Sequence, residues 1–95
     1  MKYIVRYWGQ IKRSAGASEE TIELDTEPTI ADLLERLASR HDETFRMLVL
    51  DDAGRPRPSL VVIVDDEQLP LDSSRRLPDG ASVTLLPPIA GGTPT

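Results

Sequence analysis

The sequence predicts a single α+β domain, in which one main helix packs on one face of a rolled, mixed β-sheet. Two short segments near the N-terminus have the alternation of half-buried strands, and the next apolar segment has the spacing of an amphipathic helix. Further strand-like segments follow up to residue 86. Two strands, a helix and returning strands, in this order, can bury one apolar face between a single sheet and its helix.

The first two strands are expected at residues 2–8 (KYIVRYW) and 20–24 (ETIEL). The first is rich in β-branched and aromatic residues, and alternation places Tyr7 on one of its faces and Trp8 on the other. Residues 9–18 (GQIKRSAGAS) contain two glycines and are expected to form a loop. The two strands should therefore pair as an antiparallel hairpin with a long connection.

The main helix is expected over residues 30–41. Thr29 is a good N-cap, and Asp32 follows it at the spacing of a capping box. Apolar residues then recur at the i, i+3, i+4 and i+7 positions of one helical face, at Ile30, Leu33, Leu34 and Leu37. This face should cover the sheet.

The second half of the chain returns to the sheet. Residues 45–50 are expected to pack as a short helical turn or a strand, before a loop at residues 51–58 (DDAGRPRP). Strands are expected at residues 60–64, 68–71 and 81–86, with a tight turn at Asp65-Asp66. Pro87 and Pro88 end the last strand, because proline cannot donate to a β-ladder. This order is that of the β-grasp, or ubiquitin-like, fold, which we expect over residues 1–88, followed by a flexible tail over residues 89–95.

Composition and charge narrow the classes of function. The chain has 95 residues, no cysteine, one histidine and a formal net charge of −5. An acidic domain is a poor nucleic-acid binder, and no segment has the length and hydrophobicity of a signal peptide or a membrane helix. The lack of cysteine excludes disulfides, thiolate metal sites and thiol catalysis. We therefore expect a cytoplasmic protein with no bound cofactor or metal and with no nucleic-acid or membrane partner.

The side chains show no pattern of an active site. His41 lies near the end of the expected helix, where a structural role is favoured. The acidic pairs Asp51-Asp52 and Asp65-Asp66 lack the spacing of a calcium loop and are expected as solvated turns. Neither a catalytic triad nor a glycine-rich phosphate loop is visible. The chain is not expected to be an enzyme.

The C-terminal segment has a more specific pattern. After the last strand and its two prolines, the side chains shrink progressively through Ile89 and Ala90 to Gly91 and Gly92. A tail of this shape can thread a narrow channel, because glycine lets the backbone approach another protein's catalytic groups without a Cβ in the way. The alternative is an ordinary frayed terminus.

The segment DGASVTLLPPIAGG, residues 79–92, resembles the C-terminal signature of the small ubiquitin-like sulfur carriers of the MoaD and ThiS type. The strand at residues 2–8, the segment TIADLLERLASR and the segment LVVIVDDEQL are similar to the family over the remainder of the chain. The resemblance thus extends to Gly92, and its C-terminal motif is the specific part.

The resemblance implies a carrier that has no catalytic group of its own. An E1-like adenylyltransferase of the MoeB or ThiF type would use ATP to adenylate the carboxylate of Gly92. Persulfide sulfur from a partner would then convert this terminus to a thiocarboxylate, which donates sulfur to an acceptor held by a synthase subunit. Ile89, Ala90 and Gly91 would thread into the partner.

Partner docking needs a surface beside the tail. If Val83 and Leu85 join the core, alternation exposes Leu86, and Trp8 would also face outwards. First and last strands are neighbours in a β-grasp, so Trp8, Leu86, Pro87 and Pro88 are the expected partner interface. The alternative is that the following loop buries Trp8.

The chain departs from the family pattern after Gly92, because Thr93, Pro94 and Thr95 follow. With Thr93 attached, Gly92 has no free carboxylate. The chain would then be a precursor cut between Gly92 and Thr93, for example by a JAMM-type protease. Otherwise the extension is a cloning remnant, or the protein has lost carrier activity and only binds partners.

Two classes of function and several pathways stay open at this point. A ubiquitin-like modifier or a non-catalytic binding module is the alternative to a sulfur carrier. The acceptor could belong to molybdopterin, thiamine, cysteine or other sulfur metabolism.

Overall fold

The structure, a computed structural model, describes residues 1–87, and it contains five strands and three helices in that range. The strands are β1 (Lys2–Tyr7), β2 (Glu19–Glu23), β3 (Val61–Val64), β4 (Glu67–Leu69) and β5 (Ser82–Leu86). The helices are α1 (Gly9–Ala15), α2 (Ile30–Arg40) and α3 (Glu43–Val49). The predicted tail, residues 89–95, and Pro88 lie outside the described residues.

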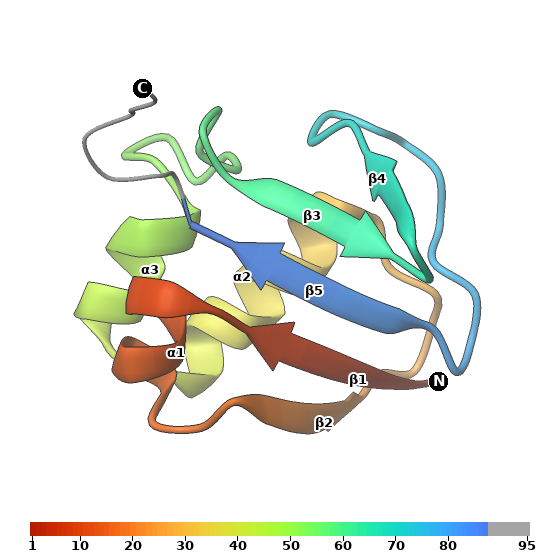
Figure 1. The fold of residues 1–95 in the computed structure, drawn as a ribbon. Coiled ribbons are helices and arrows are strands. Elements are labelled where there is room, and N and C mark those ends of the chain that lie inside the picture. The colour runs from red at the N-terminus through yellow and green to blue at the C-terminus, as the bar shows by residue number, and fades with distance from the viewer. Residues whose placement is uncertain (88–95) are drawn as a thin grey trace.

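The sheet has the strand order β2-β1-β5-β3-β4 and is mixed. The pairs β1–β2, β3–β5 and β3–β4 are antiparallel, whereas the central pair β1–β5 is parallel. As Figure 1 shows, β1 and β5 run side by side in the same direction, so the first and last strands end at the same side of the sheet. The predicted antiparallel hairpin of the first two strands is confirmed. The prediction that the first and last strands are neighbours in the sheet is also confirmed.

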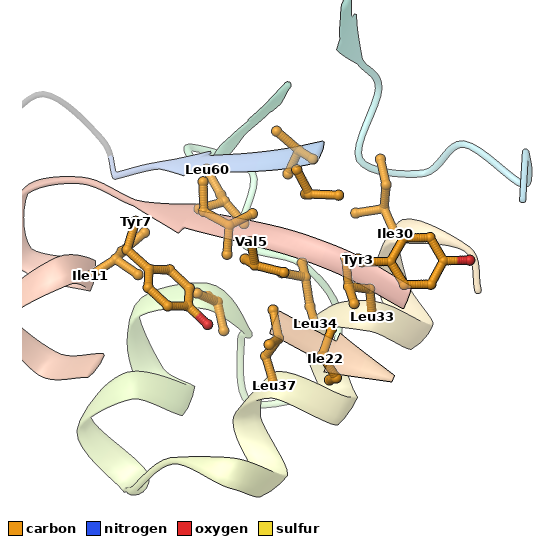
Figure 2. Close-up of a cluster of buried hydrophobic side chains, with 14 of the residues drawn as sticks. Tyr3, Val5, Tyr7, Ile11, Ile22, Ile30, Leu33, Leu34, Leu37 and Leu60 are labelled. Atoms are coloured by element: carbon orange, nitrogen blue, oxygen red, sulfur yellow. The ribbon is translucent and has the colours of Figure 1, made fainter. Parts of the chain in front are cut away.

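One face of the sheet is buried under the helices. Tyr3, Val5 and Tyr7 of β1 are at most 2% exposed. Figure 2 shows Tyr3 and Val5 on the side of α2, and Tyr7 lies beside Ile11 and packs edge-on against Phe45 of α3.

The predicted capping box starts α2: the Thr29 hydroxyl accepts a hydrogen bond from the Asp32 amide at 3.2 Å, and the Asp32 carboxylate accepts one from the Thr29 amide at 3.3 Å. The predicted fold, a β-grasp sheet with one main helix on one face, is confirmed.

The segment after Trp8 differs from its prediction, because most of the expected loop is the helix α1. The two glycines flank this helix and do not interrupt it: Gly9 begins it and Gly16 is its left-handed C-cap, with a φ of +76°. The Gly16 amide donates to the Lys12 carbonyl at 3.0 Å, as in an αL C-cap. Ile11 is fully buried and anchors the helix to the core.

The segment at residues 45–50, which the sequence left open, belongs to the helix α3. The Asp42 side chain caps this helix by accepting a hydrogen bond from the Phe45 amide at 3.1 Å. Phe45 and Val49 are buried against the core. The strand expected at residues 68–71 is β4, which is shorter and begins one residue earlier, at Glu67. It begins there because Asp65 and Asp66 form a two-residue hairpin turn with positive φ at both positions.

No helix of residues 1–87 covers the opposite face of the sheet, and the side chains on this face are exposed or half-buried. On β1 this face presents Ile4 and Arg6, and on β5 it presents Thr84 and Leu86. Within residues 1–87 the longest helix has 11 residues, and none has the length and hydrophobicity needed to cross a membrane. The uncovered face is therefore a regular surface that the fold leaves for a partner.

Candidate functional site

The parallel pairing of β1 and β5 sets the geometry at the base of the tail. The last paired residues are Tyr7 and Leu85, so Trp8 and Leu86 follow side by side, one residue further along each strand. On the other side of β5, Leu86 is paired with Val61 of β3. We call the group Trp8, Val61, Leu86 and Pro87 the tail-base patch.

The tail-base patch is apolar and accessible. Trp8 is 58% exposed, which makes it the most exposed of the large hydrophobic side chains in residues 1–87. Val61, Leu86 and Pro87 are half-buried, whereas Val83 and Leu85 are fully buried in the core. An exposed tryptophan with aliphatic neighbours has the composition of an interaction site.

The structure thus confirms the predicted exposure of Trp8, whereas Leu86 lies outside the core but is half-buried. The alternative, in which the next segment buries Trp8, is wrong because that segment forms α1 and turns its own Ile11 into the core. Trp8 is left on the outside as the N-cap residue, in an extended conformation. The role of the patch as a partner interface stays a prediction.

Charged groups surround the patch on the β1 side. A shallow hollow beside Trp8 is lined by Arg6, Lys12, Ser18 and Glu19. The Arg6 guanidinium lies 3.4 Å from the Glu19 carboxylate, and both side chains are more than half exposed. An apolar centre with a polar, solvent-accessible rim is the usual anatomy of a protein interface.

A half-buried polar cluster supports the patch from the core side. The Tyr7 hydroxyl donates a short hydrogen bond to the Glu20 carboxylate, and His41 Nε2 lies 2.5 Å from the same carboxylate. The Arg40 guanidinium lies 3.5 Å from its other oxygen. The cluster ties the end of β1 to β2 and to the end of α2, directly before Trp8.

The surroundings of Glu20 favour its charged form. Partial burial alone would raise its pKa, but the hydrogen bonds from Tyr7 and His41 and the positive charge of Arg40 outweigh burial and lower the pKa of Glu20. Burial and the hydrogen bond to Glu20 together raise the pKa of Tyr7. Glu20 is therefore an anionic anchor that the phenol and the imidazole hold in place.

This cluster was not visible in the sequence. Glu20 lies in an expected strand with no partner indicated, because Tyr7 and His41 are 13 and 21 residues away along the chain. His41 stacks on Phe45 with ring centroids 4.5 Å apart, so its position is fixed by packing as well as by Glu20. In residues 1–87 no three His, Cys, Asp or Glu side chains come together as metal ligands.

Several predicted site residues cannot be placed. Pro88 of the expected interface lies outside the described residues, as do the threading residues Ile89, Ala90 and Gly91. The same holds for Gly92 and for the expected processing site between Gly92 and Thr93. The described site is therefore the base from which this segment leaves the sheet.

Comparison with known proteins assigns the chain to a family. The ThiS family model matches residues 5–92, which is nearly the whole chain. The chain therefore belongs to the ThiS family. A search of curated proteins found no match.

Solved structures share the fold over nearly their full length. SAMP1 from Haloferax volcanii is 22% identical with a TM-score of 0.84, and the match covers 97% of this chain and 100% of that one. A putative molybdopterin converting factor, subunit 1, from Pyrococcus furiosus is 28% identical with a TM-score of 0.73, over 94% and 99% of the two chains. A chain of the BexX/CysO complex from Amycolatopsis orientalis is 24% identical with a TM-score of 0.65, over 95% and 99%.

Proposed function

We propose that this protein is a sulfur carrier that acts as a co-substrate through a C-terminal thiocarboxylate on Gly92. The observation that carries the proposal is the extent of the family match, which includes Gly91-Gly92 and ends there, before Thr93. The fold supports it, because β5 leads directly to this segment beside an exposed apolar patch.

The chemistry takes place at the main-chain terminus. The Gly92 carboxylate attacks the α-phosphorus of ATP on an E1-like partner of the MoeB or ThiF type, and pyrophosphate leaves. A persulfide on a partner then attacks the acyl-adenylate carbon, AMP leaves, and an acyl disulfide forms. A thiol reduces its S–S bond, so that the carrier keeps one sulfur as a thiocarboxylate and the partner is left with a disulfide.

The carrier's own residues position and present the terminus. Glycine at both tail positions lets the backbone approach the nucleotide without a Cβ. Trp8 and Leu86 supply apolar area for docking, and the chain itself needs no acid, base or metal ligand for these steps. ATP is bound and used by the activating partner.

The extension after Gly92 makes the chain a precursor in this proposal. While Thr93 is attached, Gly92 is an amide, which adenylation cannot use. A processing protease, for example of the JAMM type, would hydrolyse the Gly92–Thr93 bond and release residues 93–95. Processing would then control how much carrier is available for activation.

The acceptor partner is a synthase subunit that receives the sulfur. The Pyrococcus furiosus relative is named as subunit 1 of a molybdopterin converting factor, which supports a molybdopterin-type acceptor. The Amycolatopsis orientalis relative was solved as a complex of two proteins, BexX and CysO, which supports docking of the carrier on a second protein. Another sulfur-containing metabolite is the alternative product.

A modifier function is the second candidate, because the Haloferax volcanii relative is named a small archaeal modifier protein. Activation would be the same, but a lysine amine would attack the adenylated Gly92 in place of a persulfide. Isopeptide-linked adducts in the cells of origin would favour this function. A thiocarboxylate without such adducts would favour the carrier.

Pyrophosphate exchange with an E1-like enzyme from the same organism tests the proposal in vitro. A chain that ends at Gly92 should support ATP–pyrophosphate exchange, and the full chain to Thr95 should not. A chain that ends at Gly91 is the matched control, because it also ends in a free glycine carboxylate but is one residue shorter. Equal exchange by the full chain would contradict the precursor role, and no exchange by any chain would contradict activation.

A further inference from the structure

We propose that Gly9 is a positioning residue for the C-terminal tail: its missing side chain leaves the space into which Pro87 packs, and this contact sets the direction in which the chain leaves β5. The inference rests on the proposed function only where it links this direction to adenylation. The contact itself is a property of the fold.

The distances single out Gly9. A Cβ built on Gly9 would lie 2.9 Å from Cγ and 3.7 Å from Cδ of Pro87, and the shorter distance is closer than carbon atoms approach without displacement. Three other glycines in residues 1–87 also have positive φ, namely Gly16, Gly54 and Gly80, but a Cβ there would have no neighbour within 4 Å. Among these four glycines, only Gly9 makes room for another residue by its lack of a side chain.

Gly9 is held between two anchored residues and cannot easily move away from Pro87. Tyr7 before it is buried and hydrogen-bonded to Glu20, and Ile11 after it is fully buried. The first turn of α1 closes with the Lys12 amide donating to the Trp8 carbonyl at 3.3 Å. A side chain at position 9 would therefore displace Pro87 and leave α1 in place.

Pro87 would pass this displacement on to the tail. Its Cγ belongs to a ring that is closed on the backbone nitrogen, so beyond a change of ring pucker the main chain has to shift. On the N-terminal side, Leu86 is held in the ladder opposite Val61. On the C-terminal side the next residue is also a proline, which restricts Pro87 to extended conformations. The shift would therefore change the direction of exit.

Energy transfer within the full chain tests the contact directly. Trp8 is the single tryptophan and there is no cysteine, so an acceptor dye on Thr95→Cys gives one donor and one acceptor. We expect Gly9→Ala to change the mean transfer efficiency beyond replicate error. Gly16→Ala, at the other end of α1 and also at positive φ, is the matched control and should leave the efficiency unchanged.

A second substitution checks that the change comes from Pro87. Pro87→Ala removes Cγ and keeps Cβ, so Gly9→Ala combined with Pro87→Ala should return the efficiency to that of Pro87→Ala alone. If Gly9→Ala does not fold, Gly9→Asn replaces it, because asparagine tolerates positive φ better than other residues with a Cβ. Unchanged transfer in the folded variant would overturn the inference.

The link to function is tested on the chain that ends at Gly92. Docking depends mainly on Trp8 and Leu86 of the tail-base patch, and chemistry depends on the arrival of the terminus. Because Gly9→Ala displaces Pro87 and leaves Trp8 and Leu86 in place, it should lower kcat for adenylation about tenfold and change KM much less. Gly16→Ala should change neither value. An unchanged kcat together with altered energy transfer would show that tail direction does not limit activation. Failure of every chain to react would instead contradict the proposed function and leave the energy-transfer result intact.

Discussion

Glu20 joins three elements through one carboxylate, with Tyr7 on β1 and with Arg40 and His41 at the end of α2. A charge held by several donors stabilises the folded state as long as it stays ionised. Trp8 follows Tyr7 directly. The Glu20 carboxylate therefore also helps to fix the end of β1, which sets the position of the exposed Trp8 side chain.

We predict that Glu20→Gln lowers the free energy of unfolding by about 1–3 kcal/mol at pH 7, as for a hydrogen bond to a charged group. The pKa of Glu20 is lowered in the folded state, so its stabilisation is complete above its unfolded pKa and is lost as the pH falls through the folded value. The difference between the wild type and the variant should therefore shrink in acid. Urea unfolding from pH 7 down to pH 3 measures it.

Glu19→Gln is the matched control for this prediction, on the neighbouring position of the same strand. Glu19 pairs with Arg6 at the surface, and such exposed pairs contribute little, so we expect a change below about 1 kcal/mol. A Glu20→Gln variant as stable as Glu19→Gln at pH 7 would show that the cluster does not stabilise the fold.

The helices show how far local sequence determines an element. α2 was predictable because its cap, its capping box and four apolar residues on one face are all local signals. α1 was not, because it has one buried apolar residue in seven positions and two glycines at its boundaries, which are equally typical of a loop. Its helical form depends on tertiary packing of Ile11, which no local pattern contains.

At the element scale we predict that Ile11→Ala destabilises the protein by about 2–5 kcal/mol, because it removes a fully buried side chain and leaves a cavity. Arg13→Ala, at an exposed position of the same helix, should change stability by less than about 0.5 kcal/mol. Chemical denaturation measures both. Equal stability of the two variants would mean that Ile11 does not anchor α1.

The candidate site was predictable to a similar extent. Strand alternation was enough to predict that Trp8 and Leu86 lie outside the core, since the side-chain period of a strand is fixed. It did not predict that Leu86 is half-buried. The contact between Gly9 and Pro87 was not predictable, because the two residues meet through the parallel β1–β5 pairing after 77 residues of intervening chain. Glu20 was missed for the same reason: its partners are neighbours in the fold and distant in sequence.

For the whole molecule, the proposed function places docking and chemistry on separate parts of the chain. The buried face of the sheet holds the fold together, the open face beside β5 presents the tail-base patch, and the reacting group of the proposed function is the chain terminus. In the proposed function, such a protein serves several partners in turn, because each needs only the patch and the terminus.

We predict that Trp8→Ala weakens binding to the E1-like partner by about 2 kcal/mol or more, as for a central aromatic contact, while the fold is retained because Trp8 is exposed. Met47→Ala is the matched control, since Met47 is 56% exposed but lies on α3, outside the patch. Calorimetric titration compares the two. Equal affinities would contradict docking through the patch.

The intact mass of the protein isolated from its own cells tests the central claim most directly. The account predicts a chain that ends at Gly92, with part of the population carrying sulfur in place of one oxygen, a mass increase of about 16 Da that alkylation of the thiocarboxylate distinguishes from oxidation. A protein that always retains residues 93–95 and never carries this sulfur would contradict the account and leave a binding module as the better description.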